Sequence, residues 1–198
     1  MTASTSSAEA PVAATLHLTR ESLAVRTATT SADVAAFASL SQQYFNSLTH
    51  LGLDLSFQSF QQEVDSLPGD FAPPDGVILL VSVAAADGCR QDIGAVALRP
   101  FTPHHIHGPA SAESDWTTRT CEMKRLNVLP EWQGHGAGRL LAQTVVEAGR
   151  VIGYKRMVLD TLERLKGANK LYERLGFQRC PKYNGTPLPE VCFWEMML

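Results

Sequence analysis

A glycine-rich turn between a predicted strand and a predicted helix constrains this chain more than any other feature. It has the sequence Gln133-Gly134-His135-Gly136-Ala137-Gly138-Arg139 and joins the β-rich run Thr120–Val128 to the helical pattern Gly136–Gly153. Small residues at alternating positions let a ligand approach the backbone closely. The free N–H groups of the first helical turn point outward at the positive end of the helix dipole. A turn of this kind can bind phosphate, which predicts an anion site here.

The spacing of the glycines separates this turn from two common phosphate-binding motifs. A dinucleotide-binding fingerprint requires Gly-x-Gly-x-x-Gly, and the third glycine here comes one residue early. A Walker loop requires Lys followed by Ser or Thr after its last glycine, whereas this chain has Arg139-Leu140. Taken alone, the turn is also compatible with glycines that only lead a strand into a helix.

Hydrophobic periodicity predicts alternating strands and helices along the rest of the chain. The predicted strands are Leu23–Thr27, Val77–Ala85, Asp92–Arg99, Thr120–Val128, Arg156–Thr161, Phe177–Arg179 and Val191–Met197, with a hairpin turn at Ala86-Asp87-Gly88. The predicted helices are Ala32–Leu48 with Ser31 as its N-cap, Phe57–Leu67, Gly136–Gly153 and Leu165–Leu175. This order predicts a mixed sheet with helices on both faces. Residues 1–22 are expected to be a disordered tail and residues 23–198 a single domain.

Composition excludes several classes of protein. The chain has 198 residues, of which 44% are hydrophobic, so it can build a core without a metal or a disulfide framework. Its longest apolar run, Val77–Ala86, is about half the length that a membrane span requires. The 4 cysteines form no Cys-x-x-Cys pair, which favours reduced thiols and a cytoplasmic location. His104-His105-x-His107 has no Cys or acidic residue nearby, so we expect a surface loop and no metal.

Charge is distributed unevenly along the chain. The segment from Arg119 to Lys182 holds 13 Lys/Arg and 6 Asp/Glu, a net charge of +7, whereas residues 1–118 carry −8 and the whole chain −3. The overall negative charge argues against a nucleic-acid partner. The basic segment indicates either ordinary exposed helix faces or a binding site for a polyanion.

Two longer motifs surround these features. The first is Met123-Lys124-Arg125-Leu126-Asn127-Val128-Leu129-Pro130-Glu131-Trp132-Gln133-Gly134-His135-Gly136-Ala137-Gly138, and the second is Leu171-Tyr172-Glu173-Arg174-Leu175-Gly176-Phe177. In both, the chain resembles the GCN5-related N-acetyltransferase (GNAT) superfamily: the first matches its acetyl-CoA signature and the second its Leu-Tyr-x-x-x-Gly-Phe helix end. The resemblance implies a GNAT-like α/β (α+β) fold, with a mixed, mostly antiparallel central sheet flanked by helices on both faces. It also implies acetyl transfer from acetyl-CoA to a primary amine.

The resemblance implies that acetyl-CoA, the acyl donor, binds on the glycine turn and the strand before it. In the family that strand carries a bulge and splays from its neighbour, which leaves main-chain groups free to hold the pantetheine arm. Many members place an asparagine seven residues before the tyrosine, but this chain has Leu165 there, and Asn169 has the wrong spacing to replace it. The residues implied for acetyl-CoA are Leu126, Asn127, Val128, Gln133, Gly134, His135, Gly136, Ala137, Gly138 and Arg139, together with Lys166 and Lys170 as possible phosphate contacts.

Two residues are expected to carry the chemistry. A primary ammonium has a pKa near roughly 10, so it must lose a proton before it attacks, and the departing thiolate gains one. By its match to the family motif, Tyr172 is the expected acid for the sulfur; the alternative is a tyrosine that only packs beside Leu171 and Leu175. Glu122 is the candidate base, directly or through a water. The alternative is a strand carboxylate paired with Lys124 or Arg156.

The acceptor is the least constrained part of the prediction. In this fold the acceptor pocket is usually built by the first two helices, the loop before the CoA strand and the last hairpin. The candidate lining residues are therefore Tyr44, Phe45, Phe57, Tyr183 and Asn184. A small-molecule amine is the first expectation, because the sequence shows no second domain for engaging a protein; protein N-termini or lysines, or a non-catalytic acyl-CoA sensor, are the alternatives. A monomer or homodimer with no nucleic-acid or membrane partner is expected.

Overall fold

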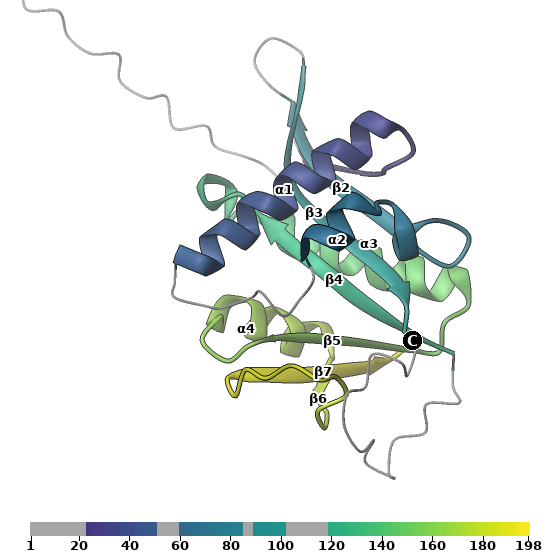
Figure 1. Cartoon of the computed structure of the whole chain (residues 1–198), viewed down its shortest axis with the longest axis vertical. Coiled ribbons are helices and arrows are strands. Elements are labelled where there is room, and N and C mark those ends of the chain that lie inside the picture. Colours follow the sequence, from purple (N-terminus) through teal and green to yellow (C-terminus); the bar gives the residue numbers. More distant parts are fainter. Residues whose placement is uncertain (1–22, 51–59, 85–88, 102–118) are drawn as a thin grey trace, which may run out of the picture.

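A single seven-stranded sheet organises the molecule (Figure 1). The computed structural model describes residues 23–50, 60–84, 89–101 and 119–198. The strands are β1 (Leu23–Thr27), β2 (Val77–Ala84), β3 (Arg90–Pro100), β4 (Thr120–Val128), β5 (Arg156–Leu162), β6 (Gln178–Arg179) and β7 (Val191–Met197), in the spatial order β1-β2-β3-β4-β5-β7-β6. Every neighbouring pair is antiparallel except β4 and β5, which are parallel. The predicted mixed, mostly antiparallel sheet is confirmed.

Helices cover both faces of this sheet (Figure 1). They are α1 (Ser31–His50), α2 (Phe60–Asp65), α3 (Ala137–Ile152) and α4 (Lys166–Leu175), with short 3-10 turns at Gly69–Phe71 and Pro130–Trp132. Residues of α1 pack into one hydrophobic cluster, and residues of α3 and α4 pack into another. The predicted order of strands and helices is therefore confirmed, with helices on both faces.

The apolar run of β2 explains how one strand serves both clusters. Successive side chains of a strand point to opposite faces of the sheet. Leu79 and Val81 pack in the same cluster as Leu141 of α3, whereas Ile78 and Leu80 pack with the α1 side of the core. All four are buried. A continuous hydrophobic run is thus required because β2 is covered on both faces.

Two helix ends differ from the sequence prediction. Thr30 rather than Ser31 caps α1, since its carbonyl accepts from Val34 N at 3.1 Å. Its hydroxyl accepts from Asp33 N at 3.2 Å, and Asp33 in turn accepts from Thr30 N at 3.0 Å, which is a reciprocal capping box. Helix α2 ends at Asp65 instead of Leu67 because Leu67 precedes Pro68, and a residue before proline is disfavoured in helical geometry.

Several expectations concern segments outside the described ranges. These are the tail at residues 1–22, the turn Ala86-Asp87-Gly88, Phe57 and His104-His105-x-His107. Of the helices that the structure does describe, none has the length and apolar character needed to cross a membrane. The same ranges contain no group of three or more His, Cys, Asp or Glu side chains arranged to hold a metal ion.

Candidate active site

Strands β4 and β5 lie together only at one end. Their parallel pairing joins Thr120 to Arg156, Cys121 to Met157 and Glu122 to Val158, and it stops there. From Met123 onward the two strands diverge, as Figure 1 shows on the side nearest α4. Main-chain groups of both strands beyond this point have no β4–β5 partner. The split leaves room for an extended ligand to add to the sheet between them.

A β-bulge lies on β4 beside the split. The register against β3 shifts between Ala95 and Ala97, so that Arg125 and Leu126 together face a single residue of β3. Arg125 has a φ of 59°, the one non-glycine positive φ in the described ranges. The Asn127 side chain stabilises this backbone by donating to the Arg125 carbonyl at 2.8 Å. The bulge thus aims the main chain of β4 into the split.

The side chain of Arg125 anchors this bulge to α2. Its Nε donates to Glu63 Oε1 at 2.7 Å. Its guanidinium lies 5.0 Å from the centre of the Phe60 ring, within the range of a cation–π contact. Phe60 in turn stacks on Phe45 of α1 with ring centres 4.4 Å apart. The first two helices are therefore connected directly to the irregular part of β4.

The glycine turn forms an open cradle at the start of α3. Gly134 and Gly136 have φ of 83° and 92°, and no atom lies within 4 Å of the position where a Cβ would be added to either. No side chain caps the helix, so the N–H groups of its first turn have no capping partner there. The turn is held from below by Gln133 Nε2, which donates to the Val128 carbonyl at 2.9 Å. Space, backbone donors and the helix dipole together fit a pyrophosphate.

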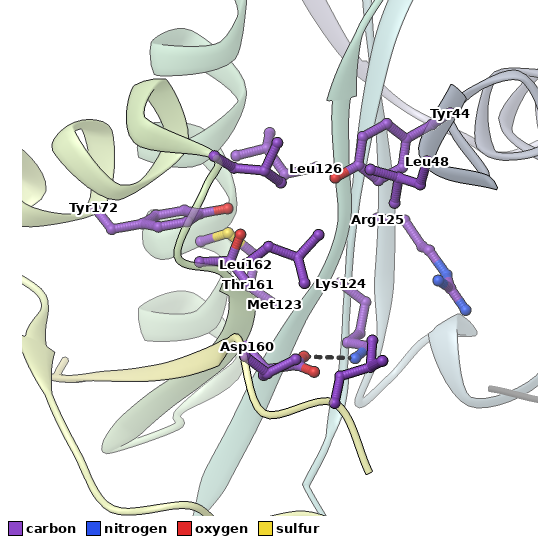
Figure 2. Close-up of a pocket in the computed structure, with 13 residues that line it drawn as sticks. Tyr44, Leu48, Met123, Lys124, Arg125, Leu126, Asp160, Thr161, Leu162 and Tyr172 are labelled. Carbon is purple, nitrogen blue, oxygen red and sulfur yellow. Dashed lines mark hydrogen bonds and ion pairs between the residues drawn. The ribbon is translucent and has the colours of Figure 1, made fainter. Parts of the chain in front are cut away.

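A pocket of about 90 Å³ opens within the split between β4 and β5 (Figure 2). Its lining comes from α1, β4, β5, α4 and the segment that leads into β7. The lining residues are Tyr44, Leu48, Met123, Lys124, Arg125, Leu126, Asp160, Thr161, Leu162, Leu165, Tyr172, Leu188 and Val191. Among these, Tyr44, Leu126 and Tyr172 were predicted as site residues from the sequence.

Tyr172 points its hydroxyl into this pocket from α4, as Figure 2 shows. Its ring is buried, with the Phe177 ring 5.9 Å away in an edge-on arrangement and the Trp194 ring at 6.4 Å. No hydrogen bond joins the hydroxyl to another residue in the described ranges. Burial raises the pKa of Tyr172 well above its usual value, so the hydroxyl stays protonated and can donate. The ring is fixed while its proton is available to a ligand.

Asn169 holds the helix that carries Tyr172. Its Nδ2 donates to the Leu162 carbonyl at 2.8 Å and to the Leu165 carbonyl at 2.9 Å. Its Oδ1 accepts from Trp194 Nε1 at 3.2 Å. The side chain thus joins the end of β5, the start of α4 and β7, one helical turn before Tyr172. Leu165, which stands where many family members have asparagine, lines the pocket instead.

A partly buried ion pair forms the polar wall of the pocket. Lys124 Nζ lies 2.8 Å from Asp160 Oδ1, and Asn184 Nδ2 donates to the other oxygen of Asp160 at 3.3 Å. Burial by itself raises the pKa of Asp160, but Lys124, Asn184 and Arg125 together lower it by more, so the net shift is downward. Burial lowers the pKa of Lys124, and Asp160 and Glu122 more than offset this. Both groups therefore remain charged at neutral pH.

Glu122 lies behind this wall and does not line the pocket. Its side chain is 3% exposed, and its Oε2 accepts from Arg99 Nε and Nη2 at 2.9 and 2.7 Å. Its other oxygen accepts from the Tyr183 hydroxyl at 3.2 Å and lies 3.5 Å from Lys124 Nζ. Glu122 is thus a paired strand carboxylate, but its main partner is Arg99; of the two expected partners Lys124 is the more distant one, and Arg156 pairs with Glu195 instead. Its expected role as base stays a prediction.

The other predicted residues lie in several different parts of the structure. Asn127 is buried beneath the bulge, Val128 packs in the core cluster on the α3 side, and the turn residues Gln133, Gly134, His135, Gly136 and Arg139 are exposed, with Gly138 half-buried and Ala137 buried at the helix start. Lys166 and Lys170 line a separate surface hollow with Arg179 and Trp194, so the structure does not bring them to the pocket. Phe45 stacks on Phe60, and Tyr183 is a core residue, while Asn184 contacts the pocket through Asp160.

The charged residues that line the pocket were not predicted as site residues from the sequence. Lys124 was expected only as a partner of Glu122, Arg125 only as part of a motif, and Asp160 was not expected in the acetyl-CoA or acceptor site. A signal was present, because Asp160 follows the apolar run Met157-Val158-Leu159 directly, inside a predicted strand. A charge in such a position needs a buried partner.

Comparison with known proteins identifies the family. A family model described as the acetyltransferase (GNAT) family matches residues 35–177. The chain belongs to the GNAT family. An uncharacterised N-acetyltransferase of Schizosaccharomyces pombe is 34% identical over 164 residues, which cover 83% of this chain and 88% of that relative. The N-acetylaspartate synthetase of Danio rerio is 33% identical over 84 residues, 42% of this chain and 30% of its own length.

Solved GNAT structures share the fold. An acetyltransferase from Salmonella typhimurium, solved with its cofactor acetyl-CoA, aligns with a TM-score of 0.54 at 18% identity, over 89% of this chain and 94% of its own. As a GNAT acetyltransferase, this protein is an acyltransferase that uses acetyl-CoA as its acyl donor. The bulge, the split and the open glycine turn described above fit that donor.

Proposed function

We propose that this GNAT protein transfers the acetyl group of acetyl-CoA to the primary amine of a small molecule by direct attack. The observation that carries the proposal is the Tyr172 hydroxyl, which is protonated, unpaired within the described ranges, and directed into the β4–β5 split. Bound acetyl-CoA supplies a thioester whose carbonyl carbon is attacked by the amine nitrogen as the C–S bond breaks. The residues below bind the donor, hold the acceptor and move the protons.

Donor binding is assigned to the bulge and the glycine turn. The main chain at Leu126, Asn127 and Val128 lies beside the split, where it can pair with the amide groups of a pantetheine arm. The first-turn N–H groups of α3, flanked by Arg139, hold the pyrophosphate. Lys166 and Lys170 line a different hollow, so any contact that they make to phosphate lies at the outer edge of the donor site.

Two proton transfers complete the reaction. Tyr172 donates its proton to the departing sulfur, which leaves as a thiol. The ammonium form of the acceptor must lose a proton before it attacks, and Glu122 remains the candidate acceptor, directly or through a water. The second proton, lost from nitrogen after attack, balances the one that Tyr172 gives to the sulfur. The carboxylate of Glu122 reaches the pocket wall through Lys124. Asp160 is the carboxylate that lines the pocket itself, so the two must be compared directly.

The acceptor is proposed to be a small amine for two reasons. The pocket has a volume of about 90 Å³ and many aliphatic walls, which suits the end of a compact molecule. One relative carries the name N-acetylaspartate synthetase, which refers to a small amino acid product. Both considerations support the proposal over a protein acceptor.

A thiol-release assay tests this proposal. Wild-type protein and acetyl-CoA are incubated with ethanolamine, glycinamide, aspartate, benzylamine, putrescine and a peptide that carries a free N-terminus and a lysine, and each product is weighed by mass spectrometry. We expect amine-dependent release of CoA thiol and a product heavier by one acetyl group for at least one small amine. Acetylation of the peptide alone would overturn the small-molecule proposal. If acetyl-CoA binds but no CoA thiol is released in the presence of any of the amines, the protein is a sensor instead of an enzyme.

A further inference from the structure

A second tyrosine faces Tyr172 across the pocket. Tyr44 lies on α1, and Figure 2 shows its hydroxyl directed into the same space as the hydroxyl of Tyr172, from the opposite side. In the described part of the chain, no residue is hydrogen-bonded to the Tyr44 hydroxyl. The Tyr44 side chain is half-buried, and its hydroxyl opens into the pocket, so a ligand in the pocket can reach it.

The ring of Tyr44 is held in place by apolar contacts. It packs beside Leu48 and Leu162 in a small hydrophobic cluster that also borders the pocket. Burial raises the pKa of Tyr44, and nearby Arg125 opposes this only in part. The group therefore remains a neutral hydroxyl, which accepts and donates hydrogen bonds but is a poor base.

A hydrogen-bond acceptor for the N–H groups of the attacking amine would orient its nitrogen. The lone pair of the amine nitrogen must point at the thioester carbonyl, so its N–H bonds point away from that carbonyl. The carboxylate on the pocket wall, Asp160, is already bonded to Lys124 and Asn184. The Tyr44 oxygen is an available acceptor, and it lies on the α1 side, opposite the proposed leaving-group acid.

We propose that the Tyr44 hydroxyl oxygen accepts an N–H bond of the acceptor amine and so orients its lone pair toward the thioester. This inference rests on the proposed function and assigns the two tyrosines different partners. Tyr172 serves the sulfur of the donor, and Tyr44 serves the nitrogen of the acceptor. The contact is made to the one group that all primary-amine substrates share.

The test compares Tyr44→Phe with the wild-type protein, using the two panel amines that the wild type acetylates fastest. The substitution keeps the ring and its packing and removes only the hydroxyl. We expect kcat/KM for both amines to fall by a similar factor of about 10, the value of one lost hydrogen bond to a substrate, with part of the loss in kcat because the lone pair is no longer oriented. Acetyl-CoA affinity, measured by calorimetry, should change less than about twofold. Tyr154→Phe, which removes a hydroxyl bonded to Asp75 away from the pocket, is the matched control and should leave both values unchanged.

The outcomes separate this inference from the proposed function. If no amine in the panel is acetylated, the proposed function fails and this inference fails with it. If amines are acetylated but Tyr44→Phe keeps the wild-type kcat and KM, only this inference is overturned. An effect on kcat/KM that differs strongly between the two amines, together with weakened acetyl-CoA binding, would show that Tyr44 only shapes the wall. That result would also overturn the inference.

Discussion

The ionisable residues around the pocket are controlled by their immediate neighbours. Tyr172 is kept protonated by burial, while Lys124 and Asp160 keep each other charged in a partly buried position. Glu122 is committed to Arg99 and Tyr183. The one strongly buried acid that faces the split without a protein partner in the described ranges is therefore a phenol. At the residue scale, this favours proton donation to a leaving thiolate.

Replacement of Tyr172 by phenylalanine tests that role. The ring and its packing against Phe177 are kept, while the donor is lost. We expect kcat to fall by about 100-fold or more with little change in acetyl-CoA affinity, as for an interaction made in the transition state. Because the pKa of Tyr172 is raised, the wild-type rate should show no loss from tyrosine ionisation up to about pH 10. Steady-state kinetics across this pH range measure both effects, and a variant with near-normal kcat would leave Tyr172 as a packing residue.

The pH dependence of kcat/KM distinguishes the two carboxylates near the pocket as candidate bases. If Glu122 accepts the proton of the amine, Glu122→Gln should reduce kcat/KM most at neutral pH. The deficit should shrink as rising pH deprotonates the free amine without help. Asp160→Asn is the matched comparison, because Asp160 lines the pocket and pairs with the same lysine.

The shape of the pH profile decides between these roles. A constant loss for Glu122→Gln between about pH 6 and 10 would assign Glu122 a structural role. Breaking a buried pair can cost about 3–5 kcal/mol, so thermal unfolding must be measured on both variants to separate lost stability from lost catalysis. If the loss in kcat/KM shrinks with rising pH only in Asp160→Asn, Asp160 is the base.

At the scale of elements, the bulge of β4 depends on one residue in an unfavourable backbone conformation. Arg125 occupies the left-handed region, and its side chain is anchored to Glu63 and Phe60. Arg125→Gly removes the anchor but favours the same backbone, whereas Arg125→Val removes the anchor and disfavours that backbone. We expect acetyl-CoA affinity within about threefold of wild type for glycine and at least about 10-fold weaker for valine. Equal acetyl-CoA affinities for the two variants, measured by calorimetry, would show that donor binding does not depend on the conformation of the bulge.

The glycine turn carries a second prediction at this scale. Gly136 has a positive φ and open space where a ligand would approach, so Gly136→Val should strain the turn and block that space. We expect Gly136→Val to weaken acetyl-CoA binding by at least about 10-fold. In Arg139→Ala we expect weaker acetyl-CoA binding that also depends less on salt. Gly167→Ala, at an uncrowded glycine of α4 with no positive φ, is the control. Unchanged affinity in Gly136→Val would overturn the assignment of this turn.

At the scale of the whole molecule, sequence patterns predicted the helices and strands better than they predicted the contacts between side chains. The apolar run of β2 and the glycines around α3 specify their local structure, because burial on both faces and positive φ each select few residues. The pairing of Glu122 with Arg99 could not be predicted, since the two residues lie on adjacent strands whose register depends on the bulge. The position of Asp160 opposite Lys124 depends likewise on where β4 and β5 diverge.

The central claim of this account is that the donor adds to the sheet between β4 and β5 and rests its phosphates on the start of α3. Hydrogen–deuterium exchange of the wild-type protein, with and without CoA, tests it most directly, because it reports on main-chain N–H groups. The account predicts slower exchange in peptides that cover residues 125–128 and 137–140 when CoA is bound, with little change in β1. Unchanged exchange in both segments at saturating CoA would contradict it.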